Sequence, residues 1–332
     1  MMYTDITFPG LGGLNIDPPQ IFFSIGDYDI YFYGVIIALG LILAVTYGLK
    51  RSRQFGIKQD DILDGVLWIV PFAVICARVY YVLAKLEDFK TFGDVLNIHN
   101  GGLAIYGGVI GAAIGVTVFT RFKKINLPAL LDLVALGFLI GQAIGRWGNF
   151  FNREAFGCYT DTLFAMRIPF EKLDIPDDAS EMFLQQVETL TQKAIEGGYV
   201  GYIQVHPTFL YESVWNVIGF IALHFLSKKR QYDGQIALGY VAWYGLGRAL
   251  IEGLRMDSLY LGDFRVSQLL AAVTCVVAVV ILLLMNLRKN DRNRLYVNYV
   301  NKMNAAEEAA KGVYALSAEA EECAEPAVET EE

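Results

Sequence analysis

Residues 128–149 read P-A-L-L-D-L-V-A-L-G-F-L-I-G-Q-A-I-G-R-W-G-N, an apolar run that ends in Arg146 and Asn149. The run matches the ~20 residues that cross a bilayer as a helix. Backbone N–H and C=O groups in lipid have no partners outside their own segment, so the run must be helical. It therefore predicts a membrane-spanning helix whose last turn carries a guanidinium and an amide.

Six further runs of this kind lie along the chain. They occupy residues 30–49, 62–84, 102–120, 208–226, 235–254 and 266–287. Hydrophobic residues make up 55% of the chain and charged residues 19%, which falls outside the usual range of soluble proteins. The sequence thus predicts an all-α integral membrane protein with seven transmembrane helices.

Lysine and arginine residues near the ends of these runs predict the orientation of the chain. Basic clusters follow the first, third, fifth and seventh runs: Lys50, Arg51, Arg53 and Lys58; Arg121, Lys123 and Lys124; Lys228, Lys229 and Arg230; Arg288, Lys289, Arg292 and Arg294. Residues 1–29 contain no basic residue. Because positive residues are retained on the cytoplasmic side, we expect the N-terminus outside and the C-terminus in the cytoplasm.

The regions outside the runs complete the predicted organisation. Residues 1–29 form an extracytoplasmic N-terminal segment, and residues 30–287 form the membrane domain. Within that domain the extracytoplasmic loop 150–207 combines turn signals with a helical pattern near 181–195, which is typical of a small arm or head. Residues 288–332 form a charged cytoplasmic tail, and their Ala- and Glu-rich composition predicts disorder.

Ionisable side chains inside the runs indicate function, because each costs roughly 2.5 to 3.5 kcal/mol to insert. In the predicted orientation, the members of the outer half are Arg78, Arg146, Glu212, Arg248 and Glu252. The spacing of Arg248, Glu252 and Arg255 puts them on one helix face, so Glu252 can pair with either arginine. Two arginines from different helices suit a phosphate, since the planar guanidinium forms bidentate hydrogen bonds.

Two other patterns have structural explanations. Asp64 and Asp132 lie in the first turn of helices that start on the inside, where a carboxylate complements the helix dipole. For Asp132 a functional role is equally open. Glycine recurs every fourth residue at Gly107, Gly111 and Gly115 and again at Gly137, Gly141 and Gly145. These stripes predict close packing that brings the outer ends of the third and fourth helices together.

The cysteines carry no metal or redox motif. Cys76, Cys158, Cys275 and Cys323 form no C-x-x-C pair, which predicts neither a metal site nor a disulfide framework. We therefore expect no metal and no cofactor, and the sequence gives no reason to expect a nucleic-acid partner.

Four segments of the chain carry a family resemblance. They are H-N-G-G-L-A-I-Y-G-G at 99–108, G-R-W-G-N-F-F-N-R-E at 145–154, H-P-T-F-L-Y-E at 206–212 and W-Y-G-L-G-R-A-L-I-E-G-L-R at 243–255. Their residues, order and separations resemble those of the bacterial phosphatidylglycerol:prolipoprotein diacylglyceryl transferases. The likeness runs from about residue 31 to residue 287, and four motifs in order are far more specific than a single glycine pattern.

The resemblance implies a reaction. The enzyme would transfer the sn-1,2-diacylglyceryl group of phosphatidylglycerol to the lipobox cysteine thiol of a prolipoprotein whose signal peptide is still in the membrane. The products would be a thioether and sn-glycerol 1-phosphate, in the first step of bacterial lipoprotein maturation. The implied location is the bacterial cytoplasmic (inner) membrane, among membrane lipids, with the active site on the extracytoplasmic side.

The resemblance also implies roles for individual residues. Arg146 and Arg248 would hold the phosphate headgroup and stabilise charge on the departing phosphate. The residues that would bind phosphatidylglycerol are Tyr33, Arg146, Asn149, Glu154, Gly157, Glu212, Tyr244 and Arg248. In the absence of a metal-binding motif, the arginines would replace the cation that phosphate chemistry often uses.

The group that removes the thiol proton stays open. A free thiol has a pKa of about 8.5, so a base or a positive field must favour the thiolate. Family members often have a histidine where this chain has Tyr106. His99, His206 and Tyr106 are the candidate catalytic bases, and a thiol activated by the arginines alone would need none.

Other functions fit the sequence less well. A CDP-alcohol phosphotransferase would need a D-G-x-x-A-R run followed by G-x-x-x-D, and an intramembrane serine protease would need a G-x-S nucleophile. The strongest alternative is a polytopic lipid transporter or binding protein without transferase activity, since buried arginines also serve translocation. No inverted repeat of broken helices supports it.

Overall fold

A computed structural model describes residues 5–26, 28–89, 91–97, 101–173, 181–256, 260–261, 264–288 and 292–309. The chain divides into two compact units, which are described separately. The first unit comprises residues 1–50, 131–230 and 234–290, and the second comprises residues 51–130, 231–233 and 291–332.

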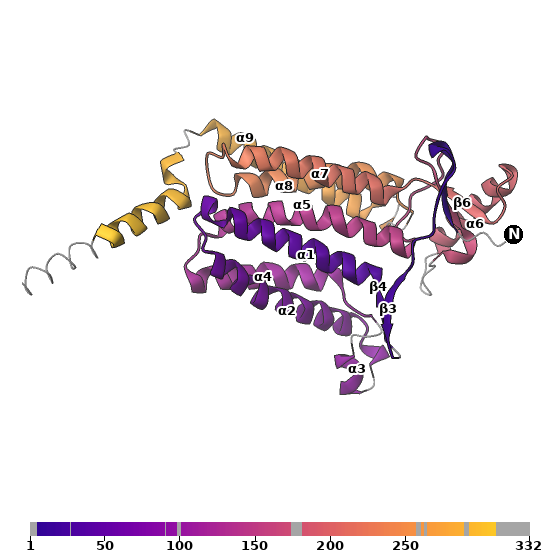
Figure 1. Ribbon diagram of the computed structural model, residues 1–332, viewed down its shortest axis with the longest axis horizontal. Helices are drawn as coiled ribbons and strands as arrows, with labels where there is room; N and C mark the ends of the chain where they lie inside the picture. Colours follow the sequence, from indigo (N-terminus) through magenta and orange to yellow (C-terminus); the bar gives the residue numbers. More distant parts are fainter. Residues whose placement is uncertain are drawn as a thin grey trace, which may run out of the picture. The chain divides into compact units, whose positions relative to one another are not determined.

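Long apolar helices dominate the described part of the chain, where six are long and apolar enough to cross a membrane (Figure 1). They are α1 (Phe32–Arg51), α2 (Gln59–Ala84), α4 (Ile105–Lys123), α5 (Leu127–Asn152), α7 (Thr208–Ser227) and α9 (Val266–Leu287). α8 (Gln235–Ile251) has 17 residues and continues as a 3-10 turn at Glu252–Leu254. The predicted class, a helical membrane protein, is confirmed, while a seventh crossing by residues 235–254 stays a prediction.

The start of α5 shows how local sequence sets these helices. The Asn126 side chain accepts the Ala129 N–H at 3.0 Å, and Pro128 occupies the first turn, where its missing N–H costs nothing. One turn later, the buried Asp132 carboxylate accepts the N–H groups of Gly234, Ile236 and Ala237 at 2.8 to 2.9 Å. Asp132 therefore caps the N-terminus of α8, which gives it a structural role.

The glycine stripes allow close helix packing, but with partners other than those expected. In α4, a Cβ added at Gly107 would lie 2.6 Å from the Cys76 oxygen of α2, and one at Gly111 would lie 2.5 Å from the Cys76 Cβ. In α5, a Cβ at Gly145 would lie 3.2 Å from Ile37 of α1. Each stripe thus packs on a different helix, α2 and α1 respectively, which differs from the expected packing of one stripe against the other.

The first unit contains a small head made of a four-stranded sheet and one helix. Its sheet has the order β2-β1-β5-β6, with β1 (Ile6–Phe8), β2 (Leu14–Ile16), β5 (Met166–Pro169) and β6 (Tyr202–Val205), all neighbours antiparallel. α6 (Glu181–Glu196) packs on β6 through Val187 and Leu190. The helical pattern predicted near 181–195 is therefore found, whereas the sheet was not predicted.

The head joins the N-terminal segment to the 150–207 loop. Thr7 of β1 lies opposite Arg167 of β5, and Arg153 donates to Asp17 at 3.0 Å and to the Pro18 carbonyl at 2.7 Å. Phe150 of α5 and Phe209 of α7 belong to the same buried core as the strands. The head therefore fixes the ends of α5 and α7, two of the helices that carry the candidate site.

The remaining elements are short or lie near the end of the chain. They are the hairpin β3 (Ile21–Ile25) and β4 (Tyr28–Tyr31), α3 (Phe92–Leu96), and the pair β7 (Tyr260–Leu261) and β8 (Phe264–Arg265). Residues 296–309, within the segment that composition assigns to a tail, are helical. The predicted disorder of residues 310–332 lies outside the described residues.

Candidate active site

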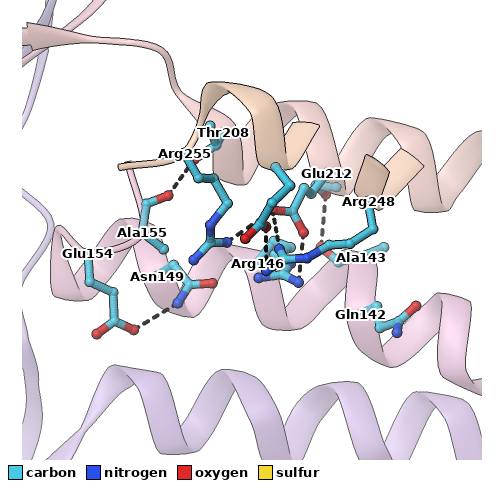
Figure 2. A network of polar contacts seen from close by, with 12 residues as sticks. Gln142, Ala143, Arg146, Asn149, Glu154, Ala155, Thr208, Glu212, Arg248 and Arg255 are labelled. Carbon is cyan, nitrogen blue, oxygen red and sulfur yellow. Dashed lines mark hydrogen bonds and ion pairs between the residues drawn. The ribbon is translucent and has the colours of Figure 1, made fainter. Parts of the chain in front are cut away.

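A buried carboxylate, Glu212 of α7, holds three guanidinium groups together. Its oxygens lie 2.7 Å from Arg146 Nη2, 3.1 Å from Arg255 Nη1 and 3.4 Å from Arg248 Nη1. Figure 2 shows Glu212 between these arginines, which come from α5, from α8 and from the chain after α8. The residue is 5% exposed, so its charge depends on these partners rather than on water.

A second carboxylate fixes Arg248 from the other side. Glu252 Oε2 lies 2.7 Å from Arg248 Nη2, and Glu252 is 1% exposed. The sequence allowed Glu252 to pair with either Arg248 or Arg255, and in the structure it pairs with Arg248. Arg255 pairs with Glu212 instead, because α8 ends at Ile251 and a 3-10 turn replaces the helical spacing.

The cluster has more positive than negative groups. Three guanidiniums face two carboxylates, and the side chains of Arg146 and Arg248 are each 20% exposed, whereas that of Arg255 is 9% exposed. A guanidinium carries five N–H donors, so one or two ion pairs leave donors for a ligand. The arrangement presents two oriented cations to an anion and keeps the third as support.

The motif after Arg146 forms the edge of the site. Asn149 Nδ2 donates to Glu154 Oε1 at 2.7 Å, and the Glu154 N–H donates to the Asn149 carbonyl at 3.0 Å (Figure 2). Arg153 and Ala155 adopt positive φ angles of 57° and 54°. These two left-handed residues end α5 and turn the chain back across its last turn, which places Glu154 beside Asn149.

Gly157 joins three chain segments. Its N–H donates to the His206 carbonyl at 3.0 Å, and the next residue, Cys158, donates to the Leu254 carbonyl at 2.7 Å. A Cβ at Gly157 would lie 2.7 Å from His206 Cβ and 3.0 Å from the Leu254 oxygen. Glycine is therefore required by the close approach of these backbones, and Gly157 positions His206 next to the chain that leads to Arg255.

The His206 imidazole has a phenol as its hydrogen-bond partner. Its Nδ1 lies 3.2 Å from the Tyr211 hydroxyl. Burial lowers the pKa of His206, which favours the neutral imidazole at neutral pH. A neutral imidazole is the form that can accept a proton.

Two tyrosines of the predicted set contact the site helix or its neighbours. The Tyr33 ring of α1 lies against Gly148, where an added Cβ would be 2.7 Å from Tyr33 Cδ2. Tyr244 of α8 stacks on Tyr240 with ring centroids 5.7 Å apart, and the Tyr240 hydroxyl accepts a hydrogen bond from Gln142 of α5 at 2.9 Å. Both aromatic groups therefore belong to the surroundings of α5.

The segment with Tyr106 belongs to the second unit. Tyr106 lies in the first turn of α4 and is 49% exposed, and His99 lies outside the described residues. Arg78 of α2 organises the chain before α4: it donates to the carbonyls of Asp94, Val95, Asn97, Gly101 and Gly102 at 2.7 to 3.1 Å. The sequence predicted that Arg78 lies in the outer half of its membrane helix. It did not predict that Arg78 binds the backbone carbonyls of the loop before α4.

Replacing Arg78 with glutamine should therefore loosen the loop before α4. Hydrogen bonds from a charged donor contribute about 1.5 to 3 kcal/mol each when buried, and glutamine cannot reach five carbonyls. Hydrogen exchange of residues 91–97 and 101–105 in purified protein should accelerate at least tenfold, while exchange in α7 stays unchanged. Lys85→Gln, at the residue that follows α2, is the matched control; unchanged protection in Arg78→Gln would contradict the assignment.

A reciprocal tryptophan clamp, which sequence reasoning missed, joins α7 to α8. Trp215 and Trp243 stack with centroids 4.4 Å apart, and each indole N–H donates to the other's backbone carbonyl at 3.0 Å. Each ring covers a glycine of the opposite helix, Gly247 under Trp215 and Gly219 under Trp243. In the sequence, the clamp corresponds to a W-x-x-x-G pattern in each of two apolar runs, at 215–219 and at 243–247.

Gly247→Ala should destabilise the fold, because the new methyl group would overlap the Trp215 indole. Overpacking typically costs 1–3 kcal/mol, so we expect the thermal unfolding midpoint to fall by several degrees. Gly34→Ala is the matched control, since a Cβ at Gly34 in α1 has nothing within 4 Å. A Gly247→Ala protein as stable as the control would show that the clamp is not tightly packed.

Apolar helices and a buried arginine–glutamate cluster with two partly exposed cations describe a helical membrane protein with a site suited to an anionic group. Comparison with known proteins specifies the class further. The family model for prolipoprotein diacylglyceryl transferase matches residues 20–284, and the chain belongs to this family.

Curated relatives agree over most of the chain. Each is named phosphatidylglycerol–prolipoprotein diacylglyceryl transferase. The protein from Listeria monocytogenes serotype 4b is 40% identical over 282 residues, covering 85% of this chain and 94% of the relative. That from Enterococcus faecalis is 42% identical over 264 residues, covering 78% and 88%, and enzyme 1 of Clostridium perfringens is 38% identical over 279 residues, covering 83% and 98%. The family resemblance of the four motifs is confirmed.

Proposed function

We propose that this chain transfers a diacylglyceryl group from phosphatidylglycerol to a prolipoprotein. The family match and the names of the curated relatives support this activity. In the finer form of the proposal, the acceptor is the thiol of the lipobox cysteine that follows a signal peptide. The products are a thioether and sn-glycerol 1-phosphate, and the reaction is the first step of lipoprotein maturation.

The contact of Glu212 with three guanidinium groups carries the proposal of how this happens. The thiolate sulfur forms a bond to a glycerol carbon while the bond from that carbon to the phosphate oxygen breaks. Negative charge accumulates on the departing glycerol phosphate. Arg146 and Arg248, already oriented by Glu212 and Glu252, stabilise that charge without reorganisation during the reaction.

The other predicted site residues shape the position of the headgroup. Asn149 and Glu154 are joined by a hydrogen bond at the edge of the arginine cluster, and Gly157 holds the chain of His206. Tyr33 lies against the helix that carries Arg146, and Tyr244 is joined to that helix through Tyr240. We propose that all of them bind phosphatidylglycerol, with Glu212 acting through the arginines that it orients.

The thiol proton has several candidate acceptors. His206 is suited by its lowered pKa, because the neutral imidazole accepts a proton. Tyr106 and His99 remain candidates from the second motif. A thiol that ionises in the field of Arg146 and Arg248 would instead lose its proton to solvent or to the leaving phosphate.

The proposed topology has seven crossings, with the N-terminus and the head outside and the C-terminus in the cytoplasm. It is supported by the basic residues at the ends of the first, third, fifth and seventh runs. In this topology Arg146 and Arg248 lie in the outer half of the bacterial cytoplasmic membrane. A prolipoprotein that is still anchored by its signal peptide presents its cysteine at the same surface.

A lipidation assay tests the activity. Purified protein, phosphatidylglycerol vesicles and a lipobox peptide should give a peptide whose mass increases by one diacylglyceryl group, together with stoichiometric glycerol phosphate. A peptide with serine in place of the cysteine is the control and should stay unmodified. Binding or movement of phosphatidylglycerol without a thioether product would favour the lipid transporter alternative and reject the transferase.

A further inference from the structure

A surface pocket of about 550 Å³ lies where α4 ends, within the second unit. The turn between α4 and α5 forms one wall, and the chain after residue 291 forms another. The lining residues are Thr120, Arg121, Lys124, Ile125, Asn126, Asp233, Arg294, Tyr296 and Tyr299. This volume is in the range of pockets that hold small ligands.

The pocket is lined by cations that have no carboxylate partner in the described part of the chain. These are Arg121, Lys124 and Arg294. Lys123, next to Lys124 but outside the lining, differs because it pairs with Asp64 at 2.5 Å and with Asp61 at 3.5 Å. Three cations that line one pocket without such partners favour an anionic ligand.

The acidic residue of the lining has a structural task. Asp233 Oδ2 accepts the Tyr296 backbone N–H at 2.8 Å. This contact ties the start of the helical segment 296–309 to the chain just before α8, so the carboxylate helps to build the wall.

The pocket lies at the end of a candidate membrane helix. Phe122, between two cations in the last turn of α4, is 87% exposed. An apolar ring exposed at such a position is explained by contact with lipid, while neighbouring lysine and arginine side chains reach toward the headgroups. Pockets of this kind, basic and at the membrane surface, are suited to the phosphate of a lipid headgroup.

The pocket extends beyond the part of the chain that the family shares. The family match ends at residue 284, whereas Arg294, Tyr296 and Tyr299 follow it. None of the residues assigned to the transfer reaction lines the pocket. The pocket is therefore built from residues other than those assigned to that reaction.

We propose that this pocket binds a phosphoryl group at the membrane surface, supplied by the headgroup of an anionic phospholipid and held by Arg121, Lys124 and Arg294. The bound headgroup would join the α4–α5 turn to the segment 292–299. The C-terminal helix would thereby be attached to the membrane domain more firmly in anionic membranes than in neutral ones.

Lys124 offers a variant that removes a cation without damaging the fold. It adopts a left-handed conformation, with φ of 56°, at the residue where α4 ends. Glycine is preferred at such a position, so Lys124→Gly removes the charge and relieves the backbone. A loss of binding in this variant cannot be attributed to misfolding.

The test uses delipidated full-length protein in neutral detergent. Dioctanoyl phosphatidic acid is the probe, dioctanoyl phosphatidylcholine the neutral control lipid, and native mass spectrometry counts bound lipids. The Lys124→Gly/Arg294→Gln protein should bind one phosphatidic acid fewer, or bind it about tenfold more weakly, than wild type. Lys58→Gln, which removes an exposed cation of the same unit outside the pocket, should bind as wild type.

Inorganic phosphate distinguishes the source of the phosphoryl group. If millimolar inorganic phosphate leaves phosphatidic acid bound, the site takes a headgroup; if it competes as an equal, the site takes free phosphate. The proposal is overturned if wild type and double variant bind equally, or if phosphatidic acid binds no better than phosphatidylcholine. Lipidation activity of the double variant should remain at the wild-type rate, because no residue of the arginine–glutamate cluster is changed.

Discussion

Arg248→Ala should lower kcat/KM for peptide lipidation by about 100-fold to 1000-fold, and Arg146→Ala should have an effect of the same order. Loss of one preorganised donor to a developing negative charge typically costs this much. Glu212 keeps two guanidinium partners in either variant, but Arg248→Ala also removes the partner of the buried Glu252, so a lower unfolding midpoint is expected for that variant. The measurement is the initial rate of thioether formation, with the unfolding midpoint recorded in parallel.

Two further variants separate charge from geometry in that experiment. Arg248→Lys keeps the positive charge but loses the planar donors that reach both Glu212 and Glu252, so its activity should fall between wild type and Arg248→Ala. Arg53→Ala removes an exposed arginine outside the cluster and should keep the wild-type rate. Activity within a few-fold of wild type in both alanine variants would contradict the leaving-group role.

Glu212→Ala should reduce both stability and activity. The change leaves Arg146, Arg248 and Arg255 close together without the carboxylate that compensates them. Breaking a buried ion pair by removing one partner costs about 3–5 kcal/mol, so we expect a fall of that order in the free energy of unfolding. Lipidation should become undetectable, because the arginines lose their orientation.

The matched control for Glu212 is Glu188→Ala, which removes an exposed carboxylate from α6 of the head. Denaturant unfolding in a fixed detergent gives the comparison. Glu212→Asp adds a finer test, since the shorter side chain keeps the charge but withdraws it from the guanidiniums. A Glu212→Ala protein as stable as Glu188→Ala would mean that the three arginines do not depend on this carboxylate.

Hydrophobicity predicted the helices well. The run 266–287 coincides with α9 (Val266–Leu287), and the run 208–226 begins with α7 and ends one residue before α7 does. A membrane helix needs only a long apolar segment, so local sequence is sufficient to find it. The helical segment 296–309 was missed because it is not a long apolar run. Contacts with distant residues, such as that of the Tyr296 N–H with Asp233, support it instead.

The head sheet was beyond the reach of local patterns. β1 is three residues long and pairs with β5, about 160 residues later in the chain. Such short strands give little periodic signal, and their partners depend on how the whole chain folds. The sequence indicated an arm at 150–207 but not that residues 1–29 contribute strands to it.

The sequence predicted which residues belong to the candidate site better than it predicted which of them pair with one another. Motifs and membrane position selected Arg146, Glu212 and Arg248, which the structure brings together. The pairing of Arg255 with Glu212 was missed, because helical spacing does not continue beyond Ile251. Asp132 was left undecided because its partners, the N–H groups at the start of α8, lie about 100 residues away.

The central claim is that Arg146 and Arg248 act as one unit, oriented by Glu212, on the departing phosphate. Rates of thioether formation in Arg146→Gln, Arg248→Gln and the double variant test it most directly. Each single variant should lose about 100-fold or more, and the double variant should lose clearly less than the product of the two, because residues that act as a unit are not additive. Full activity in either single variant, or losses that multiply, would contradict the account.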